Sequence, residues 1–288
     1  MKTRIITAIV AIALFVPVCI FSDYIIFPIA ISILCAIGVF EMTKCLNFHK
    51  NLVLTIPMYI IALSMPIIRF NKIIGTDMKF SVVAIACAFF MLIYCLVYSM
   101  FKKDACKASE ILTLYGLFVY VVGCFTSIVM VRYSSDGMGH FMYVLIFLGA
   151  WVSDTFAYFT GILLGKHKLI PSVSPKKTIE GAIGGVVFTL IAFVIYGVVL
   201  NYVLNVSIPL YTFIILGVFL PVVSQIGDLI ASAVKRQYGI KDYGNIFPGH
   251  GGVLDRFDSV MLVAPTLCLI NGVINLVTGV YLLWVMKI

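Results

Sequence analysis

The sequence contains few charged residues: only 11% of its 288 residues are Asp, Glu, Lys or Arg, whereas 62% are hydrophobic. So little polar surface cannot coat a water-soluble globule of this size. No internal repeat, low-complexity tract or soluble linker interrupts the chain. A soluble basic domain is also missing, so the net charge of +8 does not predict nucleic-acid binding. The chain must therefore be surrounded by lipid.

Clusters of Cys or His with metal-binding spacing are also missing. The eight cysteines lie mostly within apolar runs, where they are interpreted as small packing residues. The basic start, with Lys2 and Arg4 before an apolar run, is compatible with a secretory signal. A second apolar segment follows at once instead of a polar mature domain, so an uncleaved first span is the simpler interpretation.

Long apolar runs are what the sequence has in abundance. About 18 or more apolar residues in a helix can cross a bilayer core roughly 30 Å thick. We therefore predict an all-α polytopic membrane protein, with about nine transmembrane helices and a polar active site on the cytoplasmic side. The predicted spans are residues 5–22, 24–42, 53–70, 79–101, 110–131, 141–164, 180–204, 208–234 and 259–286. Only Asp23 separates the first two, which form either a tight hairpin or one interrupted element.

The positions of the 20 Lys and Arg residues predict the orientation. Cytoplasmic loops of membrane proteins carry the excess of positive charge. With the N-terminus inside, the outer segments hold only Arg69, Lys72, Lys79, Arg132 and Lys287. We therefore expect the N-terminus and the active site on the cytoplasmic side, where basic loops also attract anionic lipid headgroups.

The character of the chain changes near residue 141. Residues 1–140, with about five spans and little that is polar, are predicted to form a transmembrane scaffold. Residues 141–288 carry charged residues, Gly and Pro in or beside the spans, and we expect a catalytic region with cytoplasmic loops 165–180 and 235–258. Glu41, at the inner end of the second span, is interpreted as a helix-end cap.

Two carboxylates lie well inside predicted spans. An ionisable residue there costs several kcal/mol unless it faces a partner or a cavity, so Asp154 and Asp228 are candidate functional residues. Asp228 belongs to a polar stripe on one helix face. The stripe consists of Ser224, Gln225, Asp228, Ser232 and Lys235. Interhelical hydrogen bonds that hold the bundle together are the alternative interpretation.

The most polar segment, 235–258, includes the end of this stripe. Its glycines permit the backbone to approach a ligand closely; they include Gly249, Gly251 and Gly252. Its cationic donors for phosphate are Lys235, Arg236, Lys241 and Arg256. The hard oxygen ligands are Asp228, Asp255 and Asp258. Such ligands, with no His or Cys cluster nearby, favour Mg²⁺ over zinc, and Mg²⁺ commonly bridges carboxylates and substrate phosphates.

The loop 165–180 repeats this theme, because it is basic, rich in hydroxyl groups and directly precedes a predicted helix. A helix N-terminus attracts anions, so Lys176 and Lys177 are predicted to bind phosphate. Pro175 also suits the first turn of a helix, so capping is the alternative interpretation of part of the loop. That interpretation concerns Ser174, Thr178 and Glu180.

Two glycine patterns beside this loop do not predict nucleotide binding. Gly161-x-x-x-Gly165-Lys166 is one residue shorter than a Walker motif and lacks the following Ser or Thr. Gly181-x-x-x-Gly185 is typical of close helix packing.

Taken together, these motifs resemble the signature of the phosphatidate cytidylyltransferases, also called CDP-diacylglycerol synthases. The long pattern is Ser232-x-x-Lys-Arg-x-x-x-x-Lys-Asp-x-x-x-x-x-Pro-Gly-His-Gly-Gly-x-x-Asp-Arg-x-Asp258. Further landmarks are Ser174-Pro-Lys-Lys-Thr-x-Glu-Gly181, Asp154-x-x-Ala-Tyr158 and Gln225-x-Gly-Asp228. The resemblance covers about residues 150–260, and no departure removes a charged residue. The N-terminal spans resemble that family only in hydropathy.

The resemblance implies the transfer of CMP from CTP to phosphatidic acid, which gives CDP-diacylglycerol and pyrophosphate in phospholipid biosynthesis. It implies Mg²⁺ as the cofactor, with K⁺ as a further candidate ion. The implied location is a bacterial cytoplasmic membrane, with membrane lipids and no nucleic acid among the partners. The sequence does not determine the oligomeric state, and a homodimer is the assembly we consider.

The resemblance also assigns roles to individual residues. Asp228 and Asp255 are expected catalytic metal ligands, with Asp258 as a third candidate ligand. Lys235 and Lys176 are expected catalytic donors to the reacting phosphates. The remaining candidates bind or position substrate: Asp154, Tyr158, Ser174, Lys177, Thr178, Ser232, Arg236, Lys241, His250, Gly251, Gly252 and Arg256.

Other functions stay open at this point. A CTP-dependent lipid kinase of the dolichol-kinase type would transfer the γ-phosphoryl group to a lipid alcohol and release CDP. A secondary transporter would use Asp154 and Asp228 as a cation site, but the two-fold repeat of such proteins is missing. A CDP-alcohol phosphotransferase is disfavoured, because the Asp-Gly-x-x-Ala-Arg core of that family is absent from the sequence.

Overall fold

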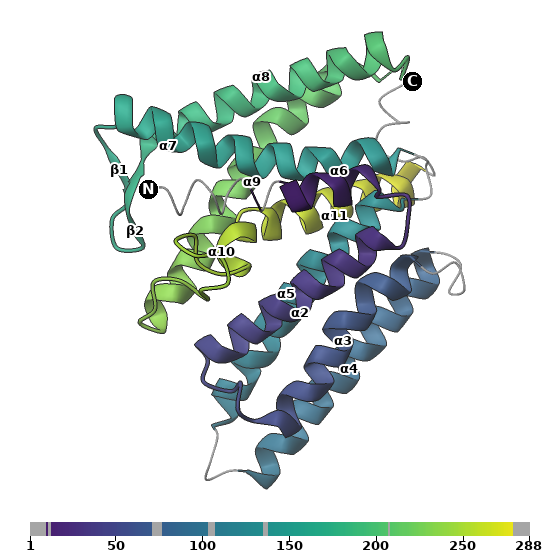
Figure 1. Cartoon of the computed structure of the whole chain (residues 1–288), viewed down its shortest axis with the longest axis vertical. Coiled ribbons are helices and arrows are strands. Elements are labelled where there is room, and N and C mark those ends of the chain that lie inside the picture. Colours follow the sequence, from purple (N-terminus) through teal and green to yellow (C-terminus); the bar gives the residue numbers. More distant parts are fainter. Residues whose placement is uncertain are drawn as a thin grey trace. The chain divides into compact units, whose positions relative to one another are not determined.

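The computed structural model describes residues 10, 13–70, 77–102, 107–134, 138–206 and 208–278 (Figure 1). Most of these residues are helical, and the described sheet is a single pair of short strands, which confirms the all-α prediction. Seven of the described helices are long and apolar enough to cross a membrane. The protein is therefore an integral membrane protein.

The seven helices correspond to seven of the predicted spans. They are α2 (Ile26–Cys45), α3 (Leu52–Phe70), α4 (Asp77–Phe101), α5 (Ala108–Arg132), the continuous helix Gly139–Leu163, α8 (Ile179–Val203) and α9 (Leu210–Gln237). The predicted number of nine is not confirmed. Residues 5–9, 11 and 12 of the predicted span 5–22 are outside the described residues, and the last span corresponds to α11 (Val260–Thr278), whose described apolar part is shorter.

The chain divides into two compact units. One comprises residues 1–130 and 238–256, and the other comprises residues 131–237 and 257–288. The polar segment 235–258 is therefore shared between the units. The predicted division into a scaffold and a catalytic half stays a prediction.

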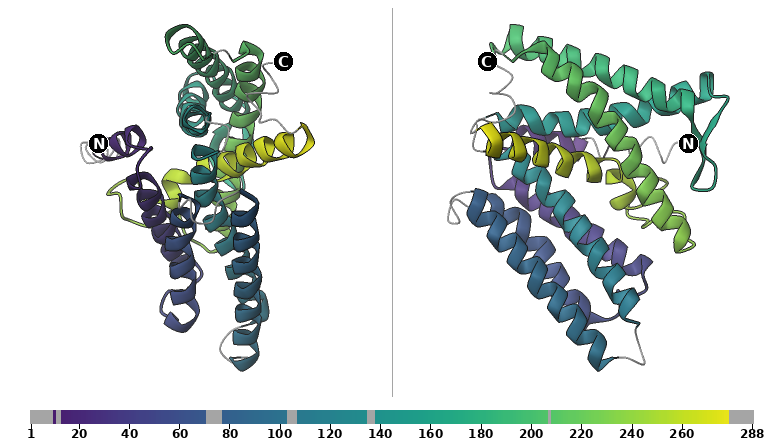
Figure 2. Two further views of the ribbon diagram at one scale, coloured as in Figure 1. Left: turned by 90° about the vertical axis from the view of Figure 1, so that its right-hand side faces the viewer. Right: turned by 180° about the vertical axis from the view of Figure 1, so that it is seen from behind.

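The first unit contains α2, α3, α4 and most of α5, with α3 and α4 running side by side (Figures 1 and 2). One face of α2 is buried over its whole length, because apolar side chains recur at helical spacing. These side chains are Phe27, Ile31, Cys35, Val39 and Met42. Glu41 lies among them and is 1% exposed.

In the second unit α7 (Ser153–Leu163) and α8 pack closely along each other, and α9 packs against α8 (Figure 2). Small residues allow the approach. A methyl group added at Gly181 would come within 2.6 Å of the carbonyl oxygen of Ala157, and one at Gly185 within 2.9 Å of that of Ser153. The interpretation of the Gly181 pattern as a packing motif is thus confirmed.

A π-helical turn interrupts the span that carries Asp154. The helix α6 (Gly139–Phe147) continues through η1 (Leu148–Val152) into α7. Such turns insert an extra residue into a helix and occur frequently at functional sites. Asp154 follows directly, as the second residue of α7.

A small β-hairpin connects α7 to α8. Its strands β1 (Lys168–Ile170) and β2 (Ser174–Thr178) pair antiparallel, and α8 begins at the next residue. Ser174 therefore starts a strand, and its interpretation as a helix cap is wrong. Thr178 is the cap, because its Oγ1 accepts a hydrogen bond from the backbone N–H of Gly181 at 3.1 Å.

Glu180 accepts a hydrogen bond from its own backbone N–H in the first turn of α8, and it also binds the start of the hairpin. Its carboxylate accepts hydrogen bonds from the backbone N–H groups of Lys166, at 3.1 Å, and His167, at 3.2 Å. The Nδ1 of His167 lies 2.6 Å from Oε1 of the same carboxylate. Glu180 thus ties the start of the hairpin to the first turn of α8.

Candidate functional site

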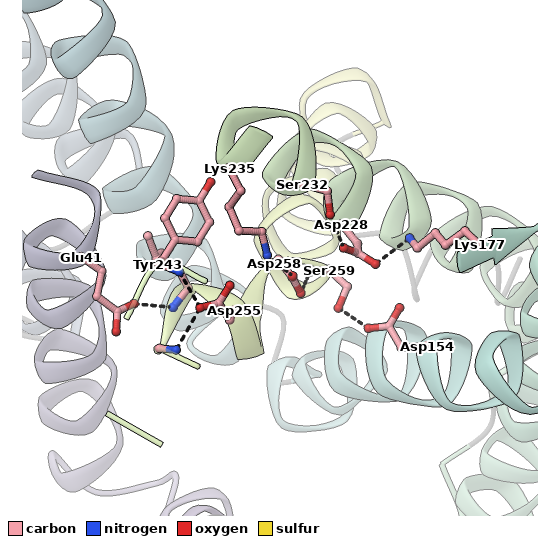
Figure 3. Close-up of polar contacts among 12 residues, drawn as sticks. Glu41, Asp154, Lys177, Asp228, Ser232, Lys235, Tyr243, Asp255, Asp258 and Ser259 are labelled. Atoms are coloured by element: carbon pink, nitrogen blue, oxygen red, sulfur yellow. Dashed lines mark hydrogen bonds and ion pairs between the residues drawn. The ribbon is translucent and has the colours of Figure 1, made fainter. Parts of the chain in front are cut away.

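The predicted polar stripe lies on the last turns of α9. Asp228, Ser232 and Lys235 follow each other at spacings of four and three, which places them on one helix face. Ser232 Oγ donates a hydrogen bond to Asp228 Oδ1 at 3.2 Å (Figure 3). Lys235 is 8% exposed, and its Nζ lies 3.9 Å from Oδ2 of Asp258.

The hairpin contributes a lysine to this helix face. Lys177 Nζ lies 2.6 Å from Asp228 Oδ2, as an ion pair between β2 and α9 (Figure 3). Successive residues of a strand point to opposite faces, and Lys176 is exposed. The structure therefore places Lys177, rather than Lys176, against Asp228.

Asp154 is connected to the same region through Ser259. The hydroxyl of Ser259 donates to Asp154 Oδ2 at 2.6 Å, and the backbone N–H of Ser259 donates to Asp258 Oδ1 at 3.0 Å. Ser259 thereby links α7 to the residues just before α11. The sequence analysis missed Ser259, although it directly follows the last Asp of the signature.

The electrostatics of this region are dominated by carboxylates. Burial raises the pKa of Asp258, the negative charges of Asp228 and Asp154 raise it further, and Lys235 lowers it. Three carboxylates, of Asp154, Asp228 and Asp258, outnumber by one the two lysines paired with them, Lys177 and Lys235. A cation would relieve that excess.

Among the residues that the structure describes, no group of three or more His, Cys, Asp or Glu is arranged to hold a metal ion by itself. Mg²⁺ at nucleotide sites is commonly held by one or two carboxylates, with substrate phosphates and water completing its coordination. Asp258 and Asp228, whose negative charge contributes to the raised pKa of Asp258, fit such an ion. This donor set suits an ion that arrives with a polyphosphate.

In the first unit the glycine-rich segment forms a closed turn. The backbone N–H of His250 donates to the carbonyl of Phe247 at 2.8 Å, with Pro248 and Gly249 at the two central positions. Gly249 has φ +77°, as a type II turn requires at its third residue. Phe247 N–H in turn donates to the carbonyl of Gly251 at 2.9 Å. The order Pro-Gly-His-Gly is therefore explained by backbone geometry.

The backbone on both sides of this turn is folded around Asp255. Its Oδ2 accepts hydrogen bonds from the backbone N–H of Tyr243, at 2.7 Å, and of Gly252, at 2.9 Å. Asp255 is 5% exposed, and hydrogen bonds to a charged oxygen are strong ones. Asp255 and Asp228 belong to different units, so the expectation that they share one ion stays a prediction.

Glu41 holds the same segment from another side. Its Oε1 accepts a hydrogen bond from the backbone N–H of Val253 and its Oε2 one from that of Leu254, both at 2.9 Å (Figure 3). These donors lie at the start of α10 (Leu254–Phe257). The interpretation of Glu41 as a cap of its own helix is wrong, because its carboxylate binds a segment far along the chain.

Several predicted site residues lie at the surface of their units. Tyr158 is 64% exposed. The exposed cations are Lys176, Arg236, Lys241 and Arg256, and His250 and Ser174 are half-buried. Exposed cations beside buried carboxylates are suited to a ligand with several negative charges.

The fold is that of an integral membrane protein with lysines paired to carboxylates beside its spans. The chain belongs to the cytidylyltransferase family, whose profile matches residues 2–273. It is therefore a nucleotidyltransferase.

Individual relatives agree with this assignment. The chain is 35% identical over 267 residues to a phosphatidate cytidylyltransferase of Staphylococcus haemolyticus, covering 93% of this chain and 97% of that protein. It is 35% identical over 267 residues to one of Staphylococcus aureus strain COL, with the same coverage. A phosphatidate cytidylyltransferase of Bacillus subtilis is 38% identical over 181 residues, which are 62% of this chain and 65% of that protein.

Proposed function

We propose that this chain is a phosphatidate cytidylyltransferase, which transfers CMP from CTP to phosphatidic acid in the membrane. Similarity to proteins of that name over nearly the whole chain supports the proposal. The signature residues on which the sequence interpretation rests are all present.

In this reaction a phosphate oxygen of phosphatidic acid forms a bond to the α-phosphorus of CTP. The bond from that phosphorus to the oxygen bridging to the β-phosphate breaks, and pyrophosphate leaves. A phosphate monoester has its second pKa near 6, so the attacking group is already largely dianionic at neutral pH. The reaction therefore needs alignment and charge neutralisation of two anions more than it needs a general base.

The observation that carries the proposal is the ion pair of Lys177 with Asp228 at the end of α9. It places a cationic donor from the hairpin beside a carboxylate that fits Mg²⁺. Lys177 and Lys235 would donate to phosphate oxygens, with Lys176 approaching from the exposed side. Ser232 and Asp154 orient this region through the hydrogen bonds of Asp228 and Ser259.

We further propose Mg²⁺ as the cofactor, held by Asp228, Asp258 and Asp255, with K⁺ as a second candidate. When bound, the ion would neutralise charge on the triphosphate. We propose that the N-terminus and this site face the cytoplasm, so that CTP reaches phosphatidic acid in the inner leaflet.

The test is to incubate the purified protein with phosphatidic acid, Mg²⁺ and each of the four nucleoside triphosphates, and to identify the lipid and the released anion. We expect CDP-diacylglycerol and pyrophosphate, with CTP alone. Release of CDP with a phosphorylated lipid alcohol would instead identify a CTP-dependent lipid kinase.

A further inference from the structure

We propose that Glu41 is a positioning residue for the reaction, because its carboxylate fixes the backbone that carries Asp255. Each carboxylate oxygen of Glu41 accepts one backbone N–H, from Val253 and Leu254, at 2.9 Å. The next residue is Asp255. The inference rests on the proposed function, in which Asp255 is a metal ligand.

The burial of Glu41 shows how specific this contact is. The residue is 1% exposed, on an otherwise apolar helix face, where a carboxylate is unfavourable unless both oxygens are hydrogen-bonded. The N–H groups at the start of a helix lack partners within that helix. The Glu41 carboxylate accepts hydrogen bonds from two such N–H groups at the start of α10. The carboxylate and the N–H groups thereby satisfy each other's hydrogen-bonding capacity.

Two glycines give an independent indication that the segment is shaped around this carboxylate. A methyl group at Gly252 or at Gly244 would overlap the carboxylate of Glu41. Gly252 also donates its N–H to Asp255 Oδ2 at 2.9 Å. Glu41 and Asp255 thus hold the same short stretch of backbone from two directions, and a shift at one is transmitted to the other.

The consequence is that a helix from the scaffold part of the chain takes part in the geometry of the site. Mutation of a residue that orients a metal ligand commonly lowers the metal affinity by about tenfold to a hundredfold. Loss of the Glu41 carboxylate should therefore raise the Mg²⁺ requirement of the reaction, without any contact between Glu41 and a substrate.

The experiment compares full-length Glu41→Ala, Glu41→Gln and wild type. Glu110→Gln is the matched control, because Glu110 is an exposed carboxylate on the first turn of α5 that accepts a hydrogen bond from the nearby backbone N–H of Lys107. Two quantities are measured: hydrogen exchange of the amides in residues 244–256, and the Mg²⁺ concentration that gives half-maximal CMP transfer.

We expect Glu41→Ala to accelerate exchange at Val253 and Leu254 about tenfold or more, since the amides lose their acceptors. The half-maximal Mg²⁺ concentration should rise about tenfold. Glu41→Gln keeps one acceptor oxygen and should give intermediate values for both quantities, whereas Glu110→Gln should change neither.

Unchanged exchange in Glu41→Ala would overturn the proposal. Faster exchange with an unchanged Mg²⁺ requirement would also overturn it, because Glu41 would then stabilise the segment without positioning a ligand. If the wild-type protein transfers no CMP, the proposed function fails, and the exchange comparison still decides whether Glu41 anchors the segment.

A second variant, Gly252→Ala, keeps the inference testable if Glu41→Ala is poorly produced. Gly252→Ala alone should raise the Mg²⁺ requirement, because its methyl group displaces the Glu41 carboxylate. In the Glu41→Ala background the added methyl group meets no carboxylate, so Gly252→Ala should have little further effect. Fully multiplicative effects of the two changes would contradict the proposal.

Discussion

Lys177 of the β-hairpin lies 2.6 Å from Asp228 of α9, and this pair joins two segments that are distant in the sequence. Both side chains are about three-quarters buried, so the pair is shielded from much of the solvent. A lysine and a carboxylate in this arrangement can bind a polyphosphate and its cation together. The pair marks where the hairpin and the polar face of α9, the two most polar parts of the second unit, meet.

We predict that Asp228→Asn abolishes CMP transfer while membrane insertion is retained. Removing one preorganised charge from such a site lowers turnover by roughly a hundredfold or more. Asp255→Asn should have a similar effect. Transfer of label from radioactive CTP to lipid measures this, with the exposed Asp23→Asn as the matched control. Near-normal turnover in both variants would reject Asp228 and Asp255 as metal ligands.

The two adjacent lysines of β2 should behave differently. Lys177→Met removes the partner of Asp228, and we expect kcat/KM for CTP to fall about tenfold or more, as for a lost charge-assisted contact. Lys176→Met, at an exposed position, should mainly weaken long-range attraction of CTP, and its effect should diminish at high salt. Steady-state kinetics at two salt concentrations separates the two cases. Equal, salt-independent losses would show that the strand does not orient its lysines as described.

The ends of α8 should be accessible from opposite sides of the membrane. This helix has 25 residues, and at 1.5 Å per residue it is about 37 Å long, enough to cross the hydrocarbon core. In a cysteine-free background, Lys166→Cys should react with an impermeant maleimide only from the cytoplasmic side, and Leu204→Cys only from outside. The reverse pattern would invert the proposed orientation, and labelling of both from one side would exclude α8 as a span.

Packing of α7 against α8 should be sensitive to a single methyl group. Gly184→Ala places its Cβ against Thr160, whose own Cβ cannot move without the backbone, so we expect destabilisation of about 1–3 kcal/mol. Gly116→Ala in α5 meets no atom within 4 Å, and should be neutral or slightly stabilising. Thermal unfolding in detergent compares the two variants. Equal midpoints would show that the helices are not in close contact.

The membrane fold could be predicted from sequence because lipid imposes long apolar runs and makes buried charge unfavourable. That rule identified Asp154 and Asp228, and it applied equally to Glu41. The position of Glu41 at the end of a span suggested a local cap instead. Its true partners are backbone N–H groups, which every residue has, so no sequence pattern distinguishes them.

The hairpin and its lysines show a different limit. The stretch from Ser174 to Glu180 contains residues that suit a helix start, and only the pairing of β2 with β1 decides against one. The same pairing determines which of Lys176 and Lys177 faces α9. Strand register depends on contacts between segments, and a short polar strand has no apolar alternation from which to infer it.

The π-helical turn at Leu148–Val152 sets the rotational phase of everything that follows it in α7. An ordinary α-helix with one residue fewer there would turn the Asp154 side chain by about 100° around the helix axis. The carboxylate would then point away from the Ser259 hydroxyl. The number of residues in this span therefore cannot change by even one without turning Asp154 away, and the reason is unrelated to membrane thickness.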